Sequence, residues 1–138
     1  MFITETPLTV RYAETDQMGV VHHSNYAIWF EAGRTDFMRK LGLSYSLVEK
    51  NGAKLPLLEL KCRFKGFARY EDEIIIKTCI ADYTATRLVF HYKVFRKGEE
   101  KHITEGETMH CWTDGNLKPV NIKKYRPEIF ELIEKTAK

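Results

Sequence analysis

The chain has 138 residues, of which 43% are hydrophobic and 30% charged, and its formal net charge is +3. This composition is that of a folded globular protein and excludes a disordered chain. The length suits one domain with one hydrophobic core. The small positive charge does not indicate a nucleic-acid partner, and none is expected, but it is compatible with a ligand that carries phosphates.

The chain shows no sign of export or of membrane insertion. Its first residues, Met-Phe-Ile-Thr-Glu-Thr-Pro, have neither the basic nor the apolar part of a secretory signal. No apolar run approaches the ~20 residues of a membrane helix. Single cysteines stand in strand-like segments, at Cys62, Cys79 and Cys111. This spacing favours buried free thiols in a reducing compartment over a redox or metal role, so we expect a cytoplasmic protein.

The first predicted element is a strand. Near the start of the chain, apolar residues occupy every second position, at Leu8, Val10 and Tyr12. The strand is expected to end at residues 14–16, and residues 17–19 predict a turn. Ser24 has the character of a helix N-cap, a place that Asn25 could take one position later.

A long helix is predicted to follow and to end at Leu41. Its apolar positions recur at steps of four, three, four and four, at Tyr26, Phe30, Gly33, Phe37 and Leu41. That spacing places them on one helix face. The other face carries polar residues, namely Arg34, Thr35, Asp36, Arg39 and Lys40. Gly42 is placed to end the helix in a left-handed cap.

The second half of the chain has the pattern of strands. After a connector over residues 43–56, with a helical turn near 46–50, strand patterns cover residues 58–64, 73–81, 87–95 and 102–113. The first of these alternates apolar and charged residues and is predicted to be half-buried. Gly66 after it marks a bulge or a close backbone approach. Residues 97–99 predict a hairpin connection and 114–116 a turn.

Pro127 can begin a last short helix whose apolar residues are Ile129, Phe130 and Ile133. The predicted order is therefore one strand, one long helix, four strands and a final helix. Strands joined by short turns form an antiparallel sheet, with the long helix across one face. The chain has no linker or repeat, so we expect an α+β fold in a single domain over residues 1–138.

The segment between the first strand and the long helix carries the most chemistry. Asp16 precedes the predicted helix start closely, and a carboxylate near a helix N-terminus suits attack on a carbonyl. The helix N–H groups can stabilise an oxyanion, and the carboxylate can act as base or nucleophile. By spacing alone, a turn-forming or capping carboxylate explains Asp16 slightly better. A loop histidine such as His23 is likewise more often solvent-exposed.

One long run decides between these interpretations. It reads Tyr12-Ala-Glu-Thr-Asp16-Gln-Met-Gly19-Val-Val-His-His23-Ser-Asn25-Tyr26 and continues into Trp29-Phe30-Glu31-Ala-Gly-Arg34. This run resembles the signature of the hotdog-fold acyl-CoA thioesterases, in the branch of 4-hydroxybenzoyl-CoA thioesterase and its short-chain acyl-CoA relatives. The resemblance implies a hotdog fold, which is a curved antiparallel sheet wrapped around one long helix.

The resemblance also implies an activity, namely hydrolysis of an acyl-CoA to a free acid and coenzyme A, without a cofactor or metal. Proteins that resemble this chain form homodimers, or homotetramers built from two dimers, with the active site between subunits. In the family Asp16 would be the catalytic residue, as nucleophile or as general base. His23, through its backbone N–H or its ring, would polarise the thioester carbonyl, with the His22 ring as a lesser alternative.

The resemblance also implies roles for residues around Asp16 and His23. Tyr12 matches a tyrosine of the short-chain branch and would orient the carboxylate, unless it is a core aromatic of the first strand. Gly19 would permit a tight turn near the thioester. Ser24 and Asn25 would lie beside the substrate, more as caps and structural hydrogen bonders than as catalysts. Arg87 loosely matches a basic segment of relatives and could meet the coenzyme A phosphates.

Other charged residues have simpler explanations. A basic stripe could also meet the phosphates, although a solvated strand face explains it better, at Lys61, Arg63, Lys65 and Arg69. Some hotdog enzymes use a helical acid, but Glu31 is expected to form an ion pair with Arg34, three residues later. The His22–His23 pair is weak as a metal site, because adjacent side chains tend to point apart and a third ligand is not evident.

Two rival functions stay open, and so does the identity of the acyl group. One is a different hotdog reaction, such as hydration of an enoyl thioester or hydrolysis of an acyl-carrier-protein ester. The other is a non-catalytic module that binds acyl-CoA without turnover. No hydratase motif is visible in the sequence. A module that only binds has no use for an acid such as Asp16 beside the carbonyl.

Overall fold

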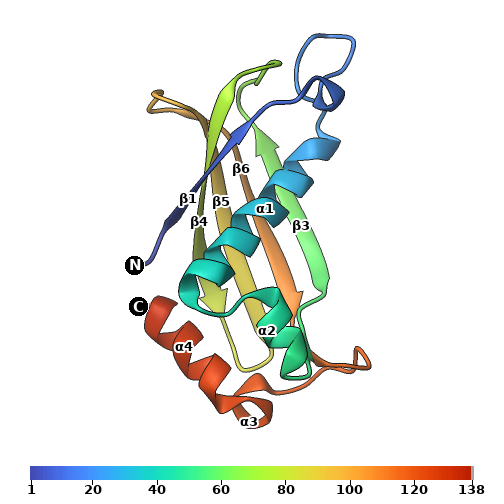
Figure 1. Cartoon of the computed structure of the whole chain (residues 1–138), viewed down its shortest axis with the longest axis vertical. Coiled ribbons are helices and arrows are strands. Elements are labelled where there is room, and N and C mark those ends of the chain that lie inside the picture. Colours follow the sequence, from blue (N-terminus) through green and yellow to red (C-terminus); the bar gives the residue numbers. More distant parts are fainter. Residues whose placement is uncertain (138) are drawn as a thin grey trace.

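The computed structural model describes residues 1–137 and shows one long helix lying against a curved sheet (Figure 1). Its strands are β1 (Thr4–Thr9), β2 (Ala53–Lys54), β3 (Leu57–Phe64), β4 (Glu73–Tyr83), β5 (Arg87–Arg96), β6 (His102–Cys111) and β7 (Thr113–Asp114). Its helices are the 3-10 turn η1 (Tyr12–Glu14), α1 (Ser24–Leu41), α2 (Tyr45–Lys50), α3 (Ile122–Tyr125) and α4 (Pro127–Ala137).

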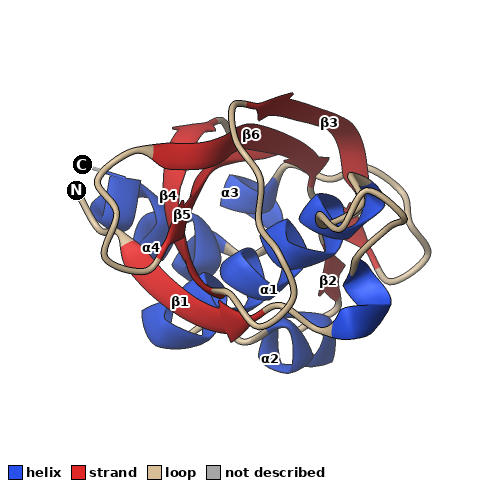
Figure 2. Cartoon of the chain, turned by 90° about the horizontal axis from the view of Figure 1, so that it is seen from above, coloured by secondary structure: helices blue, strands red, loops and turns tan. Residues whose placement is uncertain are grey.

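The main sheet is antiparallel, as expected. Its strands lie in the order β1-β4-β5-β6-β3, and β2 and β7 form a separate small pair. The sheet therefore has two edge strands, β1 and β3. Figure 2, which views the chain from above, shows the sheet curving around α1. The sheet and central helix are the arrangement expected for a hotdog fold.

The core fills the space between α1 and the concave face of the sheet. The ring of Phe30 stacks on that of Tyr92 with centroids 4.4 Å apart, and Phe37 meets Phe90 edge-on. Helix and sheet approach closely at Gly106, where an added Cβ would lie 2.5 Å from the Phe30 ring and 2.6 Å from the Lys61 carbonyl oxygen. Only glycine fits at this position without a shift of backbone or ring.

The first strand differs from its prediction. It spans Thr4–Thr9, so Tyr12 does not belong to it but begins the turn η1. The cause is local, because the Arg11 N–H donates to the Glu14 carboxylate at 2.8 Å and the Glu14 N–H donates to the Arg11 carbonyl at 3.0 Å. These bonds close a turn where the alternation of apolar residues predicts more strand.

Strand β3 also differs, in its burial. Its apolar side chains are exposed rather than half-buried, at Leu57, Leu58, Leu60 and Phe64. The reason is its place at the sheet edge, where it pairs with β6 alone. Gly66 after the strand is a close approach, since its added Cβ would lie 3.0 Å from the Ile103 side chain.

Two expectations about the helix surface are wrong. Asp36 is buried, because β1 runs beside α1 and the Thr6 hydroxyl donates to its carboxylate at 2.7 Å. Arg39 and Lys40 pair with the same carboxylate at 2.5 and 2.9 Å. Within residues 1–137, Glu31 forms no ion pair with Arg34. The end of the helix is as predicted, with Gly42 left-handed at a φ of 91°.

The terminal helix α4 begins at Pro127 and buries Ile129, Phe130 and Ile133, as predicted. The three cysteines are free thiols, but they are only half-buried. Burial raises the pKa of Cys62 to about 11, so this thiol is not activated. None of the helices in the described chain is both long and apolar enough to cross a membrane.

Candidate active site

A closed turn presents Asp16. Thr15 and Val21 form an isolated antiparallel bridge, and the Asp16 N–H donates to the Val20 carbonyl at 2.9 Å. The Gly19 N–H returns to the Asp16 carbonyl at 2.9 Å, with Gly19 left-handed at a φ of 80°. A side chain at position 19 would be strained by this backbone conformation. Gly19 thus permits the tight turn that carries Asp16.

The Asp16 carboxylate is half-exposed and only partly engaged. Its Oδ1 accepts the Met18 N–H at 2.8 Å, and within residues 1–137 its Oδ2 has no hydrogen-bond or ion-pair partner. The residue lines an open depression of about 640 Å³ with Tyr12, Gly19 and Tyr70. One carboxylate oxygen therefore stays free at a surface that a ligand can reach.

Tyr12 does not take either of the two roles weighed for it. Its ring is exposed and packs edge-on against Tyr70 with centroids 5.5 Å apart. Within the described residues its hydroxyl makes no hydrogen bond to Asp16, and the ring is not part of the core. The turn η1 directs the ring outward, so Tyr12 and Tyr70 form a wall of the depression.

The start of α1 differs from the expected capping arrangement. Ser24 is the first helical residue rather than the N-cap, and the residue before it, His23, makes no side-chain capping bond. The His22 ring takes that place, because its Nδ1 accepts the Ser24 N–H at 3.2 Å and lies 2.8 Å from the Ser24 hydroxyl. The His22 and His23 rings lie 4.0 Å apart rather than diverging.

The residue that precedes α1 leaves one backbone donor free at the start of the helix. The N–H groups of Asn25 and Tyr26 donate to the carbonyls of His22 and His23, and the His22 ring accepts that of Ser24. Within residues 1–137 the His23 N–H has no acceptor. It lies at the positive end of the helix, where orphan N–H groups bind anions. This donor is suited to the oxygen of a polarised carbonyl.

Asn25 has a structural part in this turn. Its side-chain amide donates to the Glu14 carbonyl at 2.9 Å and to the His22 carbonyl at 3.3 Å. Both bonds tie the helix start to the loop that precedes it. The amide nitrogen is therefore already engaged, in agreement with the expected role of Asn25 as a structural hydrogen bonder.

Glu14, two residues before Asp16, makes contacts beside the site that the sequence reasoning missed. It is buried, and its carboxylate accepts the Arg11 N–H and the Trp29 indole N–H, each at 2.8 Å. Burial alone would raise the pKa of Glu14, but these bonds and the nearby Arg11 guanidinium lower it below its usual value. Its place inside the long run, two residues before Asp16, was the only available signal.

The sequence reasoning also missed that the loop over residues 65–72 contacts the turn of Asp16. The Val21 N–H donates to the Ala68 carbonyl at 2.9 Å, and Arg96 donates to the Phe67 carbonyl at 2.6 Å. This loop therefore supports the turn of Asp16 from the side and supplies Tyr70 to the depression. It lies about fifty residues from Asp16 in the sequence, so no local pattern joins the two.

Arg87 is not brought to this site within the chain. It begins β5, whereas Arg96 at the other end of that strand contacts the 65–72 loop. A ten-residue strand spans roughly 30 Å, so Arg87 lies at the opposite end of the sheet. Its guanidinium contacts the Met109 sulfur at 3.7 Å.

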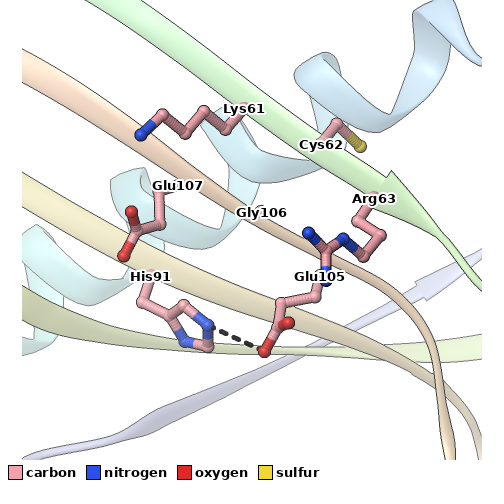
Figure 3. Close-up of a pocket in the computed structure, with 7 residues that line it drawn as sticks. All are labelled: Lys61, Cys62, Arg63, His91, Glu105, Gly106 and Glu107. Carbon is pink, nitrogen blue, oxygen red and sulfur yellow. Dashed lines mark hydrogen bonds and ion pairs between the residues drawn. The ribbon is translucent and has the colours of Figure 1, made fainter.

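The basic stripe of β3 is accompanied by acidic side chains. Figure 3 shows Lys61 and Arg63 beside Glu107 and Glu105 of β6 in a depression of about 540 Å³ on the outer face of the sheet. His91 lies 3.1 Å from Glu105, an ion pair when the ring is protonated. This face carries mixed charge, which the sequence of β3 alone did not reveal.

Among residues 1–137, no cluster of three or more His, Cys, Asp or Glu side chains could hold a metal.

Comparison with known proteins identifies the family. Residues 10–130 match the profile of the thioesterase-like superfamily. The Bacillus subtilis protein named "Putative acyl-CoA thioesterase YneP" is 33% identical over 138 residues, all of both chains. The acyl-acyl carrier protein thioesterase ATL3 of Arabidopsis thaliana is 31% identical over 118 residues, 86% of this chain and 62% of that one.

A solved structure agrees with these matches. The DHNA-CoA thioesterase of Staphylococcus aureus has a TM-score of 0.92 and 35% identity, covering 98% of this chain and 91% of that one. The long sequence run, the curved sheet around α1 and the family profile thus point to the same assignment. The chain belongs to the thioesterase-like superfamily and has its hotdog fold.

Proposed function

We propose that this protein hydrolyses acyl-CoA thioesters to a free carboxylic acid and coenzyme A. Two features of one segment carry the proposal: the Asp16 carboxylate keeps one free oxygen, and seven residues later the His23 N–H, at the start of α1, has no acceptor among residues 1–137. The names of YneP and of the DHNA-CoA thioesterase support an acyl-CoA as the substrate. The proposed unit is one hotdog domain over the whole chain.

The chemistry can follow either of two routes through Asp16. As a nucleophile, the carboxylate attacks the thioester carbon, the coenzyme A thiolate leaves, and water hydrolyses the resulting mixed anhydride. As a general base, it takes a proton from the water that attacks the same carbon. Each route develops negative charge on the carbonyl oxygen, which the His23 N–H and the helix N-terminus stabilise. A thioester suits this site because its carbonyl is weakly resonance-stabilised and a thiolate leaves readily.

The active unit is proposed to be a homodimer joined at β3, with a homotetramer as its further assembly. The support is the exposure of Leu57, Leu58, Leu60 and Phe64 on a strand with one unpaired edge. An unpaired, apolar strand edge is a ready template for another strand. A second copy at this edge would also cover Phe67 and Tyr70, which are exposed beside the Asp16 depression.

Two further proposals concern the substrate phosphates and the compartment. Arg69 precedes Tyr70 on the loop that lines the Asp16 depression, so it is better placed than Arg87 to meet coenzyme A phosphates. An Arg69→Ala variant should therefore raise KM for acyl-CoA more than Arg87→Ala does.

The free thiols of the described chain fit a reducing compartment such as the cytoplasm.

The decisive experiment measures free thiol released from a panel of acyl-CoAs. The wild-type chain should release thiol and Asp16→Asn should not. A matched control is Asp114→Asn, because Asp114 also accepts the N–H of the residue two positions later, at 2.8 Å, but lies on β7. Loss of activity in the Asp16 variant alone supports the proposal.

The same panel separates the rival functions. Tight binding without thiol release would indicate a non-catalytic module. Loss of the enoyl chromophore without thiol release would indicate a hydratase. Release from acyl-carrier-protein esters but not from any acyl-CoA would assign the activity that the name of ATL3 describes.

A further inference from the structure

A single buried carboxylate connects the two parts of the site. Glu14 is 4% exposed, and its Oε1 accepts the Arg11 N–H while its Oε2 accepts the indole N–H of Trp29, each at 2.8 Å. Trp29 is buried in the second turn of α1. The side chain of Glu14 thus fastens the turn η1 to the body of the helix.

The main chain of the same residue holds the helix start. The Glu14 carbonyl accepts the His22 N–H at 2.8 Å and the side-chain amide of Asn25 at 2.9 Å. His22 is directly followed by His23, and Asp16 lies two residues after Glu14. One residue therefore fixes both the segment that carries the carboxylate and the segment that carries the free N–H.

We propose that Glu14 is a positioning residue for thioester hydrolysis. Through its bond to Trp29 it fixes the position of Asp16 relative to the His23 N–H. The inference rests on the proposed function, because it needs a reaction at Asp16 to position. A misplacement of about 1 Å at a reacting group can lower a rate about 100-fold. Glu14 itself is buried and touches no substrate.

Conservative substitutions can remove single bonds of this network. Glu14→Gln keeps the size of the side chain but has only one acceptor oxygen, so its amide group would face either the Arg11 N–H or the Trp29 N–H. Trp29→Phe keeps an aromatic ring in the core and removes the indole donor together with part of the ring volume, so its Tm is compared as well. Both variants loosen the same connection from opposite ends.

The same helix provides a matched control. Asp36 is also a buried carboxylate, and the Thr6 hydroxyl and the Arg39 and Lys40 side chains bind it. Those bonds join α1 to β1, and none of them reaches the loop of Asp16. Asp36→Asn should therefore lower stability without a specific effect on the reaction.

The experiment compares steady-state kinetics and thermal midpoints of wild type, Glu14→Gln, Trp29→Phe and Asp36→Asn. The substrate is the acyl-CoA that the wild type hydrolyses fastest, and the temperature lies well below every Tm. We expect kcat to fall about 10- to 100-fold for Glu14→Gln and Trp29→Phe, with KM changed less than about twofold. Asp36→Asn should keep the wild-type kcat although its Tm falls.

Each outcome has a definite meaning. Wild-type kcat in Trp29→Phe and in folded Glu14→Gln would overturn the positioning role while leaving the proposed hydrolysis intact. An equal fall of kcat in Asp36→Asn would also overturn it, because the effect would then follow stability alone. If Glu14→Gln does not fold, Trp29→Phe decides by itself. A wild-type chain without thiol release would remove both proposals.

Discussion

His110 should make the stability of this fold depend on pH between 7 and 5. The ring is 1% exposed, with Nδ1 3.1 Å from the Leu55 carbonyl oxygen and Nε2 2.9 Å from the Thr108 hydroxyl. Burial, together with the charge of Arg34, lowers its pKa from 6.5 to about 4, although the bond to Leu55 opposes part of this. The folded protein therefore keeps the ring neutral while the unfolded chain protonates it.

The sign follows from this difference in bound protons. Between pH 6.5 and 4 the unfolded state binds more protons, so the free energy of unfolding falls as the pH falls. A pKa moved from 6.5 to about 4 corresponds to roughly 3 kcal/mol in full, of which about 2 kcal/mol is lost between pH 7 and 5. Above pH 7 the contribution of neutral His110 to the free energy of unfolding is fully present.

Urea unfolding at pH 7, 6 and 5, followed by the fluorescence of the buried Trp29 and Trp112, measures this loss. The matched variant is His110→Gln, which can still donate to the Leu55 carbonyl but cannot titrate. The wild type should lose about 2 kcal/mol more than His110→Gln over this range. Parallel curves for the two proteins would refute the assignment to His110.

Three further predictions follow from packing and charge. Hydrogen bonding and ion pairing hold the pKa of Asp36 at about 2 despite its burial. The ionised carboxylate therefore adds to the free energy of unfolding, and this addition is lost as the pH falls from 3.8 to 2. Asp36→Asn should remove up to about 2 kcal/mol at pH 7 and abolish that acid loss in urea titrations. Gly106→Ala should lower the free energy of unfolding by about 2 kcal/mol or more, whereas Gly115→Ala, with open space around it, should change it by less than about 0.5 kcal/mol. Leu60→Lys on the exposed edge of β3 should lower the molar mass measured by light scattering, and Leu47→Lys, equally exposed on α2, should not.

Local patterns were sufficient for the elements that carry the fold. Strand-like composition located β4 and β5, the hairpin connection at residues 97–99 located β6, and the left-handed glycine that ends α1 followed from the position of Gly42. These features depend on neighbours within a few residues, which a sequence displays directly. The long run around Asp16 likewise indicated the thioesterase-like superfamily before any geometry was available.

Burial and partner choice required the fold itself. The exposure of Leu60 follows from the edge position of β3, which is a property of strand order. Arg34 forms no ion pair with Glu31 within residues 1–137, and its charge instead helps to lower the pKa of His110. The capping function moved from Ser24 to the His22 ring, since a side chain outside the helix can satisfy the same N–H. None of these partners is fixed by spacing alone.

Three carboxylates around α1 show how environment separates roles that residue type cannot. Asp36 is buried and ion-paired, so its charge joins α1 to β1. Glu14 is buried, and backbone and indole donors bind both of its oxygens, so it can hold neighbouring segments but cannot reach a substrate. Asp16 alone combines exposure, a free oxygen and a place on the turn that leads to the His23 N–H. A base or nucleophile needs an unshared electron pair that substrate can reach, and of the three only Asp16 keeps one.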